Sequence, residues 1–528
     1  MKINILRLSI IFSILYILFY NNSFFNNIVK IYPFKDNILF VFSLAFTLFL
    51  VIVLLFLLFL YKKNTKVFLL LITTISAFCA YFMDSYGVVI DNNMIINAMQ
   101  TNSKESFDLL SIKLALYLIF LAVLPILSLL KVKIEPISLK KRVVSIFLVL
   151  VLLIANLAIF NKNYTSFFRE HKILRFYTNP TYWIYSTFYI LFNNNKEIKE
   201  IKKIANDVNI KEEKKDKEER ELIIFVVGET ARADRFSLNG YSKKTNPLLE
   251  QEKNIINFTN AYSCGTSTAY SLPCMFSFFS QNDYSYYKAA STQNILDVLN
   301  KTKNIDILWR DNNSDSKGVA LRVKYEDFKN PKKNPICDIE CRDEGMLYKL
   351  DEFIKNSLKK DIFIILHQMG SHGPAYYKRY PKEFEKFTPI CKTNQLEKCT
   401  KEQISNAYDN TILYTDYFLS KVINFLKKYD KDYEVSMFYM SDHGESLGEN
   451  GIYLHGMPYF LAPKEQTHIP AIIWVGEHSD INISKAKELQ NTQITHDNIF
   501  STLLGLFEVK TKYYNPKLDI LKDALKKE

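Results

Sequence analysis

The sequence predicts a two-part protein, in which five membrane-spanning helices precede an exported α/β domain with a mostly parallel sheet between helices. Three observations predict this fold class. Hydrophobic residues make up 48% of the 528 residues, and the long apolar runs lie before residue 161. Short apolar runs alternate with helical patterns after residue 221, and six of the seven cysteines lie there too. Because the chain is too long for one core, we expect a transmembrane domain at 1–160, interfacial helices and a charged linker at 161–221, and the exported domain at 222–528.

Five apolar runs are long enough to cross a membrane, which takes about 20 mostly apolar residues. They are Ile3–Tyr20, Ile38–Leu60, Val67–Phe82, Leu114–Leu130 and Val143–Phe160. The first run contains Arg7 near its end, where the guanidinium can reach the interface. A signal peptide is the alternative for this run, but no small-residue cleavage site follows Asn21 and further spans come after it.

Basic residues in the short loops predict the orientation of these helices, because cytoplasmic loops are enriched in Lys and Arg. The loops on one side carry Lys2, Arg7, Lys62, Lys63, Lys66, Lys131, Lys133, Lys140, Lys141 and Arg142, against Lys30, Lys35 and Lys104 on the other. The first side is therefore predicted to be cytoplasmic. An odd number of spans then places the chain after Phe160 outside, which for a bacterial inner-membrane protein is the periplasm.

The cysteines agree with this location. Cys79 lies inside the third span, and the other six form close pairs in the exported part: Cys264 with Cys274, Cys337 with Cys341, and Cys391 with Cys399. An even set of cysteines in an oxidising compartment is typical of disulfides. A zinc cluster is the alternative, although the spacings lack the repeated C-x-x-C of structural zinc sites.

The charge distribution argues against a nucleic-acid partner. Lys and Arg number 67 against 55 Asp and Glu, a net charge of +12. Residues 1–160 hold 14 of these basic and 6 of these acidic residues, so +8 of the excess belongs to the membrane part and +4 to the rest. Nucleic-acid binding is therefore set aside.

Two segments connect the predicted domains. Tyr164–Phe192 is rich in aromatic residues with interspersed Arg and Lys, which favours one or two helices lying in the bilayer interface, or an ordinary core segment. Lys196–Glu221 consists almost entirely of Lys, Glu, Asp and Ile. We expect it to be a charged linker.

The exported part contains short apolar runs without period-two alternation, which is typical of parallel strands buried on both faces. The runs are Leu222–Val227, Ile305–Trp309, Ile362–Leu366, Ser436–Met440 and Ala471–Val475, with helices predicted at Glu344–Leu358 and Glu402–Lys428. In such sheets the site lies beyond the carboxyl ends of the strands.

Chemically active residues gather at these strand ends. Glu229 follows the first run, His367 and His372 follow the third, and Asp442 and His443 follow the fourth. Any single His is more often structural than a ligand, but several at one sheet edge favour a metal site. Mixed carboxylate and imidazole ligands fit Zn²⁺ or Mn²⁺ better than Mg²⁺ or Ca²⁺.

A hydroxyl-rich turn lies between Cys264 and Cys274, with the sequence CGTSTAYSLPC. A hydroxyl in such a turn can be a nucleophile if a metal lowers its pKa. The alternative is a polar turn without a catalytic role. The residues of the turn do not by themselves decide between the two.

Several long motifs resemble those of the lipid A phosphoethanolamine transferases, which include the mobile colistin-resistance enzymes of the alkaline phosphatase and sulfatase superfamily. They are VVGET at Glu229 with Arg232, SLNGY and Thr245-Asn246-Pro247, CGTSTAYSLPCMF, RDNNSDSKG from Arg310, HQMGSHGPAYYKRYP from His367, and YMSDHGESLGENGIYLHGMP from Tyr439. The resemblance covers nearly the whole chain, including the five-span front. One departure is the Cys337–Cys341 loop, which is shorter than is usual in the family.

The resemblance implies roles for individual residues. Glu229, Thr268, Asp442 and His443 would bind a tight Zn²⁺, with Thr268 as the nucleophile. Asn313 and Lys317 match positions that contact the phosphate or headgroup, and His372 and His455 match positions that bind substrate or a second, weaker Zn²⁺. In the membrane part, Asn97, Thr101 and Glu105 match donor-lipid positions, and their i, i+4, i+8 spacing predicts one helical face.

The resemblance also implies the reaction and its partners. Phosphatidylethanolamine would be the donor, diacylglycerol the released product, and lipid A or lipooligosaccharide the acceptor, with polymyxin resistance as the consequence. We expect a membrane-bound monomer. A phosphoglycerol transferase is the nearest alternative, whereas a sulfatase would need a C-x-P-x-R motif that Ser271–Met275 lacks. A non-catalytic membrane scaffold is a third possibility, disfavoured because every proposed zinc ligand is present.

Overall fold

The computed structural model describes residues 2–101, 103–194, 200–210 and 220–525. The chain divides into two compact units. The helical unit contains Met1–Ile95 and Leu110–Asn195, and the sheet unit contains Ile96–Leu109 and Lys196–Glu528. The short segment 96–109, which interrupts the helical unit in sequence, therefore folds with the sheet unit.

Among its described residues, the helical unit contains four helices that are long and apolar enough to cross a membrane. They are α3 (Phe34–Phe59), α4 (Thr65–Tyr86), the continuous stretch of α7 (Ile112–Leu118), a π turn and α8 (Leu124–Leu130), and α9 (Leu139–Ile159). A fifth span is formed if the pair Ile5–Tyr20 and Asn22–Ile31, bent by 62°, counts as one. The chain is thus a multi-pass membrane protein with a C-terminal globular domain, as the sequence predicted.

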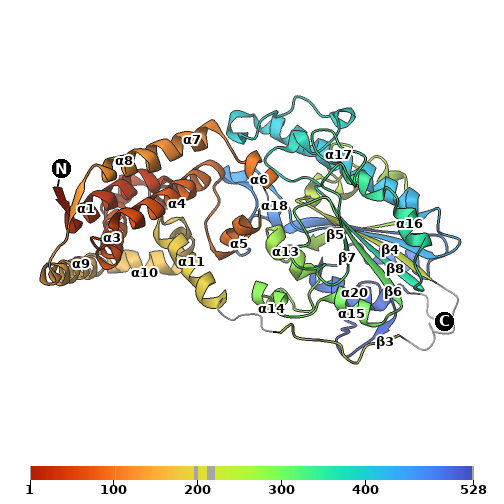
Figure 1. Cartoon of the computed structure of the whole chain (residues 1–528). Coiled ribbons are helices and arrows are strands. Elements are labelled where there is room, and N and C mark those ends of the chain that lie inside the picture. Colours follow the sequence, from red (N-terminus) through yellow and green to blue (C-terminus); the bar gives the residue numbers. More distant parts are fainter. Residues whose placement is uncertain (1, 102, 195–199, 211–219, 526–528) are drawn as a thin grey trace. The chain divides into compact units, whose positions relative to one another are not determined.

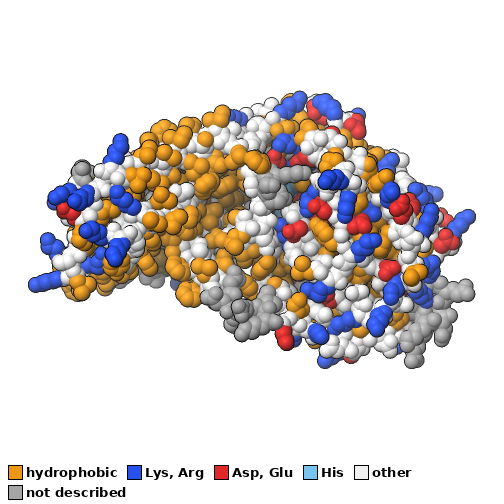
Figure 2. All heavy atoms as spheres, viewed as in Figure 1, with side chains coloured by type: hydrophobic (Ala, Val, Ile, Leu, Met, Phe, Trp, Pro, Cys, Tyr) orange, Lys and Arg blue, Asp and Glu red, His pale blue; other side chains and the backbone are white. Residues whose placement is uncertain are grey.

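Hydrophobic side chains cover much of the visible surface of these helices, whereas Lys and Arg gather at the end of the unit near the N-terminus (Figure 2). Strand β1 (Lys2–Asn4) pairs with β2 (Lys133–Glu135) at this end, and Lys66 Nζ donates to Leu130 O at 2.9 Å. The N-terminus and the two loops predicted to be cytoplasmic therefore lie together, because these contacts join them directly.

Polar side chains inside the helical unit bond to one another, because a polar group in an apolar medium needs a partner. Asn156 on α9 donates to Thr47 Oγ1 at 2.8 Å, and Tyr164 OH lies 2.6 Å from the same hydroxyl. After α9 the chain forms α10 (Asn161–Glu170) and α11 (Thr181–Asn194), which are the helices expected in the aromatic segment.

The sheet unit is built on an eight-stranded, mostly parallel sheet in the order β13-β5-β12-β9-β4-β8-β6-β7. In chain order its strands are β4 (Glu221–Gly228), β5 (Ile255–Tyr262), β6 (Ile305–Asp311), β7 (Lys324–Asp327), β8 (Asp361–His367), β9 (Glu434–Ser441), β12 (His468–Val475) and β13 (Ile494–Thr495). All five predicted runs are strands. One differs in direction, because β12 runs antiparallel to both β9 and β5.

Both faces of the sheet are buried, which explains the uninterrupted apolar runs. Along β4, Ile223, Phe225 and Val227 belong to one core, and the alternate residues Leu222, Ile224 and Val226 belong to the other. Helices α13 (Thr268–Met275), α15 (Ile295–Lys301) and α20 (Asp497–Leu506) cover the first face. Helix α17 (Lys401–Leu426) covers the second (Figure 1).

The helix predicted at Glu344–Leu358 is wrong in extent. The chain forms a 3₁₀ turn at Asp343–Leu347 and then α16 at Leu350–Lys355. Lys349, between them, has φ 55°, a left-handed conformation that ends any continuous helix. By contrast, α17 closely matches its predicted range, and Thr400 with Gln403 forms a capping box at its start.

Part of the predicted linker packs on the sheet unit. Ile204 and Ala205 are buried in the first core, and β3 (Asn209–Ile210) pairs with β14 (Val509–Lys510). The remainder of the predicted linker, at 196–199 and 211–219, lies outside the described residues.

Candidate active site

Three potential metal ligands converge at the carboxyl ends of two adjacent parallel strands. Glu229 follows β4, and Asp442 and His443 follow β9. His443 Nε2 lies 3.6 Å from Glu229 Oε1 and 3.4 Å from Asp442 Oδ2. All three side chains are buried, and a ligand atom of each lies within 4.8 Å of the others. This spacing is compatible with one shared cation.

Thr268 completes the group as the first residue of α13. Its Oγ1 donates to Glu229 Oε2 at 3.1 Å and lies 3.3 Å from His443 Nε2. Thr266, the other threonine of the turn, is directed elsewhere, because its hydroxyl donates to Met457 O at 2.5 Å. The structure therefore brings Thr268, and not Thr266, into contact with the candidate ligands.

The donor atoms of this group fit a metal ion. His443 Nδ1 donates to Gly444 O at 2.8 Å, which leaves Nε2 as the ring atom with a free electron pair. Glu229 Oε1 and Asp442 Oδ2 are buried without a hydrogen-bond partner among the described residues. Buried carboxylate oxygens without donors are costly, and a cation bound by two carboxylates, an imidazole and a hydroxyl would satisfy them.

Burial is also the main cause of the pKa shifts of Glu229 and His443. Burial, followed by the charge of Asp442, raises the pKa of Glu229 well above its usual value. Burial, followed by the neighbouring His455, lowers the pKa of His443 well below its usual value, so this imidazole is neutral at pH 7. Clustered buried carboxylates thus lie beside a neutral imidazole, and a divalent cation would offset the repulsion between the carboxylates.

Asn313 and Lys317 lie on the loop after β6, at the same edge of the sheet. Asn313 Nδ2 donates to Glu229 Oε2 and to Gln368 O, both at 2.7 Å. Lys317 is 9% exposed and its Nζ donates to Gln100 O at 3.1 Å. Asn313 therefore orients a candidate ligand, and Lys317 places a largely buried ammonium beside the segment 96–109.

Two further histidines extend the site. The His455 ring centroid lies 4.4 Å from that of His443 and 5.7 Å from that of His372. His455 Nδ1 lies 2.7 Å from Glu445 Oε2. Burial alone would lower the pKa of His455, but the carboxylates of Glu445 and Asp442 raise it, whereas burial and then Arg379 lower the pKa of His372. The pKa values of the two imidazoles are therefore shifted in opposite directions.

The predicted donor-lipid residues do not lie on one helical face. Helix α5 (Asn92–Gln100) ends before Thr101, and α6 begins at Ser103 and ends at Asp108. Thr101 Oγ1 donates to Asn97 O at 2.9 Å. Glu105, on α6, is the residue whose charge contributes to raising the pKa values of Glu229 and His455. The i, i+4, i+8 spacing does not give one helical face here, because α5 ends between Asn97 and Thr101.

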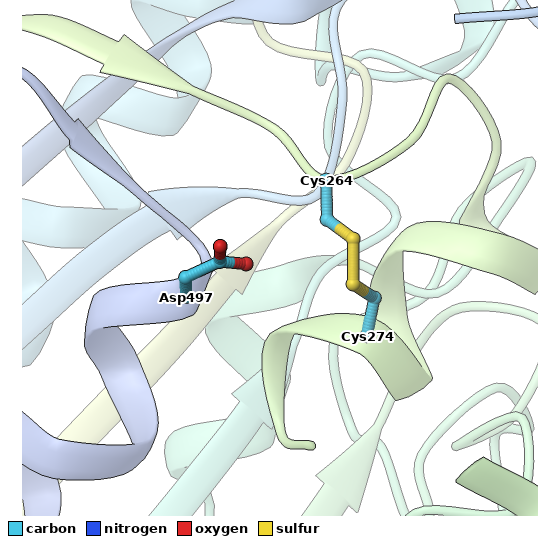
Figure 3. A group of neighbouring side chains, drawn as sticks. All are labelled: Cys264, Cys274 and Asp497. Atoms are coloured by element: carbon cyan, nitrogen blue, oxygen red, sulfur yellow. A yellow bond between two sulfur atoms is a disulfide. The ribbon is translucent and has the colours of Figure 1, made fainter. Parts of the chain in front are cut away.

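Three disulfides join the predicted cysteine pairs, and Cys79 is free. The Cys264–Cys274 bond spans the turn that carries Thr268. Asp497 lies near this pair, but both sulfur atoms are bonded to each other, as Figure 3 shows, and the group is therefore not available as a metal site.

Comparison with known proteins assigns the chain to a family. Residues 48–194 match the family described as phosphoethanolamine transferase EptA/EptB, and residues 221–509 match the sulfatase family. Phosphatidylethanolamine transferase Mcr-2 of Escherichia coli is 43% identical over 93% of this chain and 92% of its own length. The chain belongs to the phosphoethanolamine transferases.

Solved structures of other members share this transferase's fold. Lipooligosaccharide phosphoethanolamine transferase A from Neisseria meningitidis superposes with a TM-score of 0.94 at 35% identity, and the match covers 99% of both chains. The periplasmic domain of phosphoethanolamine transferase EptC from Campylobacter jejuni is 47% identical, with a TM-score of 0.55, over 62% of this chain and 99% of that domain.

The structure of this transferase also reveals residues around the site to which the sequence assigned no role. Ser441 Oγ donates to His443 O and accepts from Ala231 N, both at 2.9 Å. His496 Nδ1 accepts from Cys264 N at 3.1 Å, and its Nε2 donates to Ser441 O at 3.0 Å. Both residues join segments distant in sequence, and no spacing rule predicts such contacts.

Proposed function

We propose that this transferase moves phosphoethanolamine from phosphatidylethanolamine to lipid A, or to another envelope acceptor, through a phospho-threonine at Thr268. The observation that carries the proposal is the position of Thr268 Oγ1, which lies 3.1 Å from Glu229 Oε2 and 3.3 Å from His443 Nε2. A hydroxyl in contact with metal-ligand atoms is arranged to become a nucleophile.

Glu229, Thr268, Asp442 and His443 would hold the ion, and their mixed oxygen and nitrogen set favours Zn²⁺. When bound there, Zn²⁺ lowers the pKa of a hydroxyl and offsets negative charge on a phosphoryl group. His372 and His455 are the candidates for a second, weaker site.

In the first half-reaction, Thr268 Oγ1 attacks the phosphorus of phosphatidylethanolamine. An Oγ1–P bond forms as the hydroxyl proton of Thr268 passes to Glu229 Oε2, its hydrogen-bond acceptor. The bond from phosphorus to the glycerol oxygen breaks, and diacylglycerol leaves after taking up one proton. His455 is suited to supply this proton in its protonated form, because Glu445 binds its Nδ1 and raises its pKa, and the Nε2–H of the protonated ring is then the donor. Lys317 is suited to bind the phosphoryl oxygens of the donor.

In the second half-reaction, an oxygen of the acceptor attacks the same phosphorus. The Oγ1–P bond breaks, Oγ1 takes its proton back from Glu229, and the proton of the acceptor passes to His455. Thr268 is thereby regenerated, and one phosphoethanolamine group is transferred in each cycle. A lipid A phosphate oxygen, a sugar hydroxyl or a hydroxyl on a surface protein could each perform this step. Transfer to lipid A would reduce the negative surface charge that cationic polymyxins recognise.

This function requires an exported site at the inner membrane, where both lipids are anchored. Three disulfides in the sheet unit support an oxidising location. The clustering of basic loops at one end of the helical unit supports a cytoplasmic N-terminus. We therefore place the sheet unit in the periplasm.

Mass spectrometry tests the proposal in two ways. Lipid A from cells that express the wild-type chain is expected to carry added phosphoethanolamine, whereas lipid A from cells with Thr268→Ala is not. The purified full-length protein, incubated with phosphatidylethanolamine, is expected to carry phosphoethanolamine on Thr268. A glycerophosphate mass on Thr268 would instead identify a phosphoglycerol transferase, and an intermediate on Thr266 would refute the assignment of the nucleophile.

A further inference from the structure

A cluster of four charged residues, of which Asp108 and Arg379 are buried, joins the segment 96–109 to the rest of the sheet unit. We call it the Asp108 cluster, and it consists of Asp108, Glu340, Lys378 and Arg379. Arg379 Nη2 donates to Asp108 Oδ2 at 2.7 Å, and Lys378 Nζ donates to Asp108 Oδ1 at 2.6 Å. Arg379 Nη1 also forms an ion pair with Glu340. Two cations thus face two carboxylates, so the cluster is electrically balanced.

The burial of Asp108 and Arg379 makes their pairing important. The Arg379 side chain is 2% exposed and that of Asp108 is 9% exposed. Burial opposes ionisation of Asp108, yet Arg379 and Lys378 lower the pKa of its carboxyl group. Removing one partner from a buried pair leaves an uncompensated charge, which is strongly unfavourable. Asp108 is therefore a strong attachment point and not a surface ion pair of small effect.

Arg379 also contacts the loop that carries one of the candidate substrate residues. Its Nε donates to His372 O at 2.7 Å. The same guanidinium thus binds the segment 96–109 through Asp108, the Cys337–Cys341 loop through Glu340, and the backbone of His372. A planar fork with donors on several sides is suited to such a junction, whereas an ammonium is not.

The segment 96–109 is attached at both ends. Near its start, Gln100 O accepts from Lys317 Nζ at 3.1 Å, and Gln100 Nε2 donates to Tyr286 OH at 2.9 Å. Near its end, Asp108 is held by its cluster, and Asp108 O accepts from Asn394 Nδ2 at 2.7 Å. Thr101 and Glu105 lie between the two attachments.

A cavity of about 420 Å³ shows what the attachment maintains. Its wall includes Glu105 and Asp108 from the segment and Glu340, Met369 and Arg379 from the rest of the unit. If the segment moved away, this wall would open and Glu105 would lose its position relative to Glu229.

We propose that Arg379 is a positioning residue. Through Asp108 it fixes the segment 96–109 to the loop after β8 that carries His372 (the His372 loop), so that the predicted donor-lipid residues move together with the sheet unit. The donor-lipid role of Thr101 and Glu105 rests on the proposed function, but the attachment itself does not. Arg379 acts through the residues it holds and touches no reacting atom.

Hydrogen exchange of the full-length protein in detergent tests the attachment without any substrate. In Asp108→Asn, amide exchange in peptides covering 96–109 is expected to rise by roughly tenfold or more, because an attachment has been lost, while the strands β4 and β9 keep their protection. Asp36→Asn is the matched control, because it removes an exposed carboxylate and should change nothing. Unchanged exchange at 96–109 in Asp108→Asn would overturn the proposal.

Two further variants cover the risk that Asp108→Asn unfolds more widely. Lys378→Met removes one of the two cations and is expected to give a smaller increase confined to the same peptides. Arg379→Lys keeps the charge but not the fork, and is expected to raise exchange at both 96–109 and the His372 loop. If Lys378→Met changes nothing, or loosens the whole unit equally, the attachment is not the one proposed.

Kinetics then separates a positioning role from a catalytic one. In Asp108→Asn the segment is expected to be docked only part of the time. The apparent KM of this variant for a short-chain phosphatidylethanolamine should then rise by about the inverse of the docked fraction, roughly tenfold, with kcat within about threefold of wild type. Bound zinc should stay at the wild-type level. A loss of kcat at unchanged KM would refute the positioning role. If wild type transfers no phosphoethanolamine but the exchange result holds, the proposed function fails and the attachment stands.

Discussion

At the scale of single residues, the site separates candidate metal ligands from groups that face the substrate. Glu229, Asp442 and His443 lie around one point, whereas Lys317 and His372 lie outside that group. We expect Ala at any of the three ligand positions to reduce bound zinc and phospho-Thr268 formation together, because an ion bond is lost. Metal analysis of the purified protein, combined with mass spectrometry of the intermediate, checks this.

The matched controls are Lys317→Ala and His372→Ala. Each should keep about one zinc per chain, the occupancy of a four-ligand site, and lose turnover by roughly a hundredfold. A second activating phase in a zinc titration that disappears in His372→Ala would indicate a second, weaker metal. Loss of the tight zinc in Lys317→Ala would contradict the separation, because an ammonium cannot be a ligand.

The pKa of Glu229 predicts how pH changes the effect of zinc. The raised pKa means that the metal-free fold keeps a proton at pH values where the unfolded chain has lost it. Its free energy of unfolding therefore falls as pH rises from the usual Glu value through the raised one. Zinc needs the carboxylate, so its affinity rises over the same range. We expect the zinc-dependent increase in Tm to grow with pH.

Thermal unfolding of the full-length protein in detergent, with zinc and with a chelator, measures this effect between about pH 5 and pH 8. Glu229→Gln cannot ionise and should show a smaller zinc effect with a flatter pH dependence. An increase in Tm that shrinks as pH rises would show that the Glu229 carboxyl group is not the group that titrates.

At the scale of elements, His496 links two of the segments that carry the site. It connects the backbone of the Thr268 turn, at Cys264 N, to the end of β9, at Ser441 O. His496→Ala would leave a buried N–H and a buried carbonyl unpaired, which costs about 1–3 kcal/mol for each unsatisfied group. We expect a lower free energy of unfolding by at least one such amount, with weaker zinc binding, measured by denaturant unfolding and by chelator competition.

The pH dependence of this variant provides a separate check. Burial lowers the pKa of His496 to about 4, whereas an unfolded His titrates near 6.5. Between these values the unfolded state binds more protons, so this neutral imidazole contributes stability that is present above the unfolded pKa and is lost on acidification. His496→Gln should lose less stability than wild type between pH 7 and about pH 5. Equal losses would exclude the proposed contribution.

The helices and strands also show which structural features the sequence patterns predict and which they do not. Five of the eight strands in the sheet were predicted, because burial on both faces leaves a continuous apolar run, as along β4. The break at Lys349 and the end of α5 before Thr101 were not predicted, because single residues between apolar positions determine where these helices stop. Likewise, the antiparallel direction of β12 depends on its neighbours β9 and β5.

At the scale of the whole molecule, the arrangement of basic loops predicts the topology. Reporter fusions test it in cells. A phosphatase fused after Asn194 is expected to be active, because the phosphatase folds only outside, and a fluorescent protein fused there is expected to be dark. The same pair inserted between Lys63 and Asn64 should give the reverse result. A fluorescent fusion after Asn194 would overturn both the topology and the periplasmic site.

The sequence by itself predicted the membrane helices and five strands of the sheet, because hydrophobic runs are local patterns, and it placed Glu229, Asp442 and His443 at strand ends. The roles of these three residues and of Thr268 came from the family resemblance and stay predictions. Only the tertiary structure decided the tautomer of His443, the link through His496, and the membership of 96–109 in the sheet unit. Arg379 and Asp108 are 271 positions apart. Such pairs form because folding buries opposite charges together, and no spacing along the chain records which partner each charge will meet.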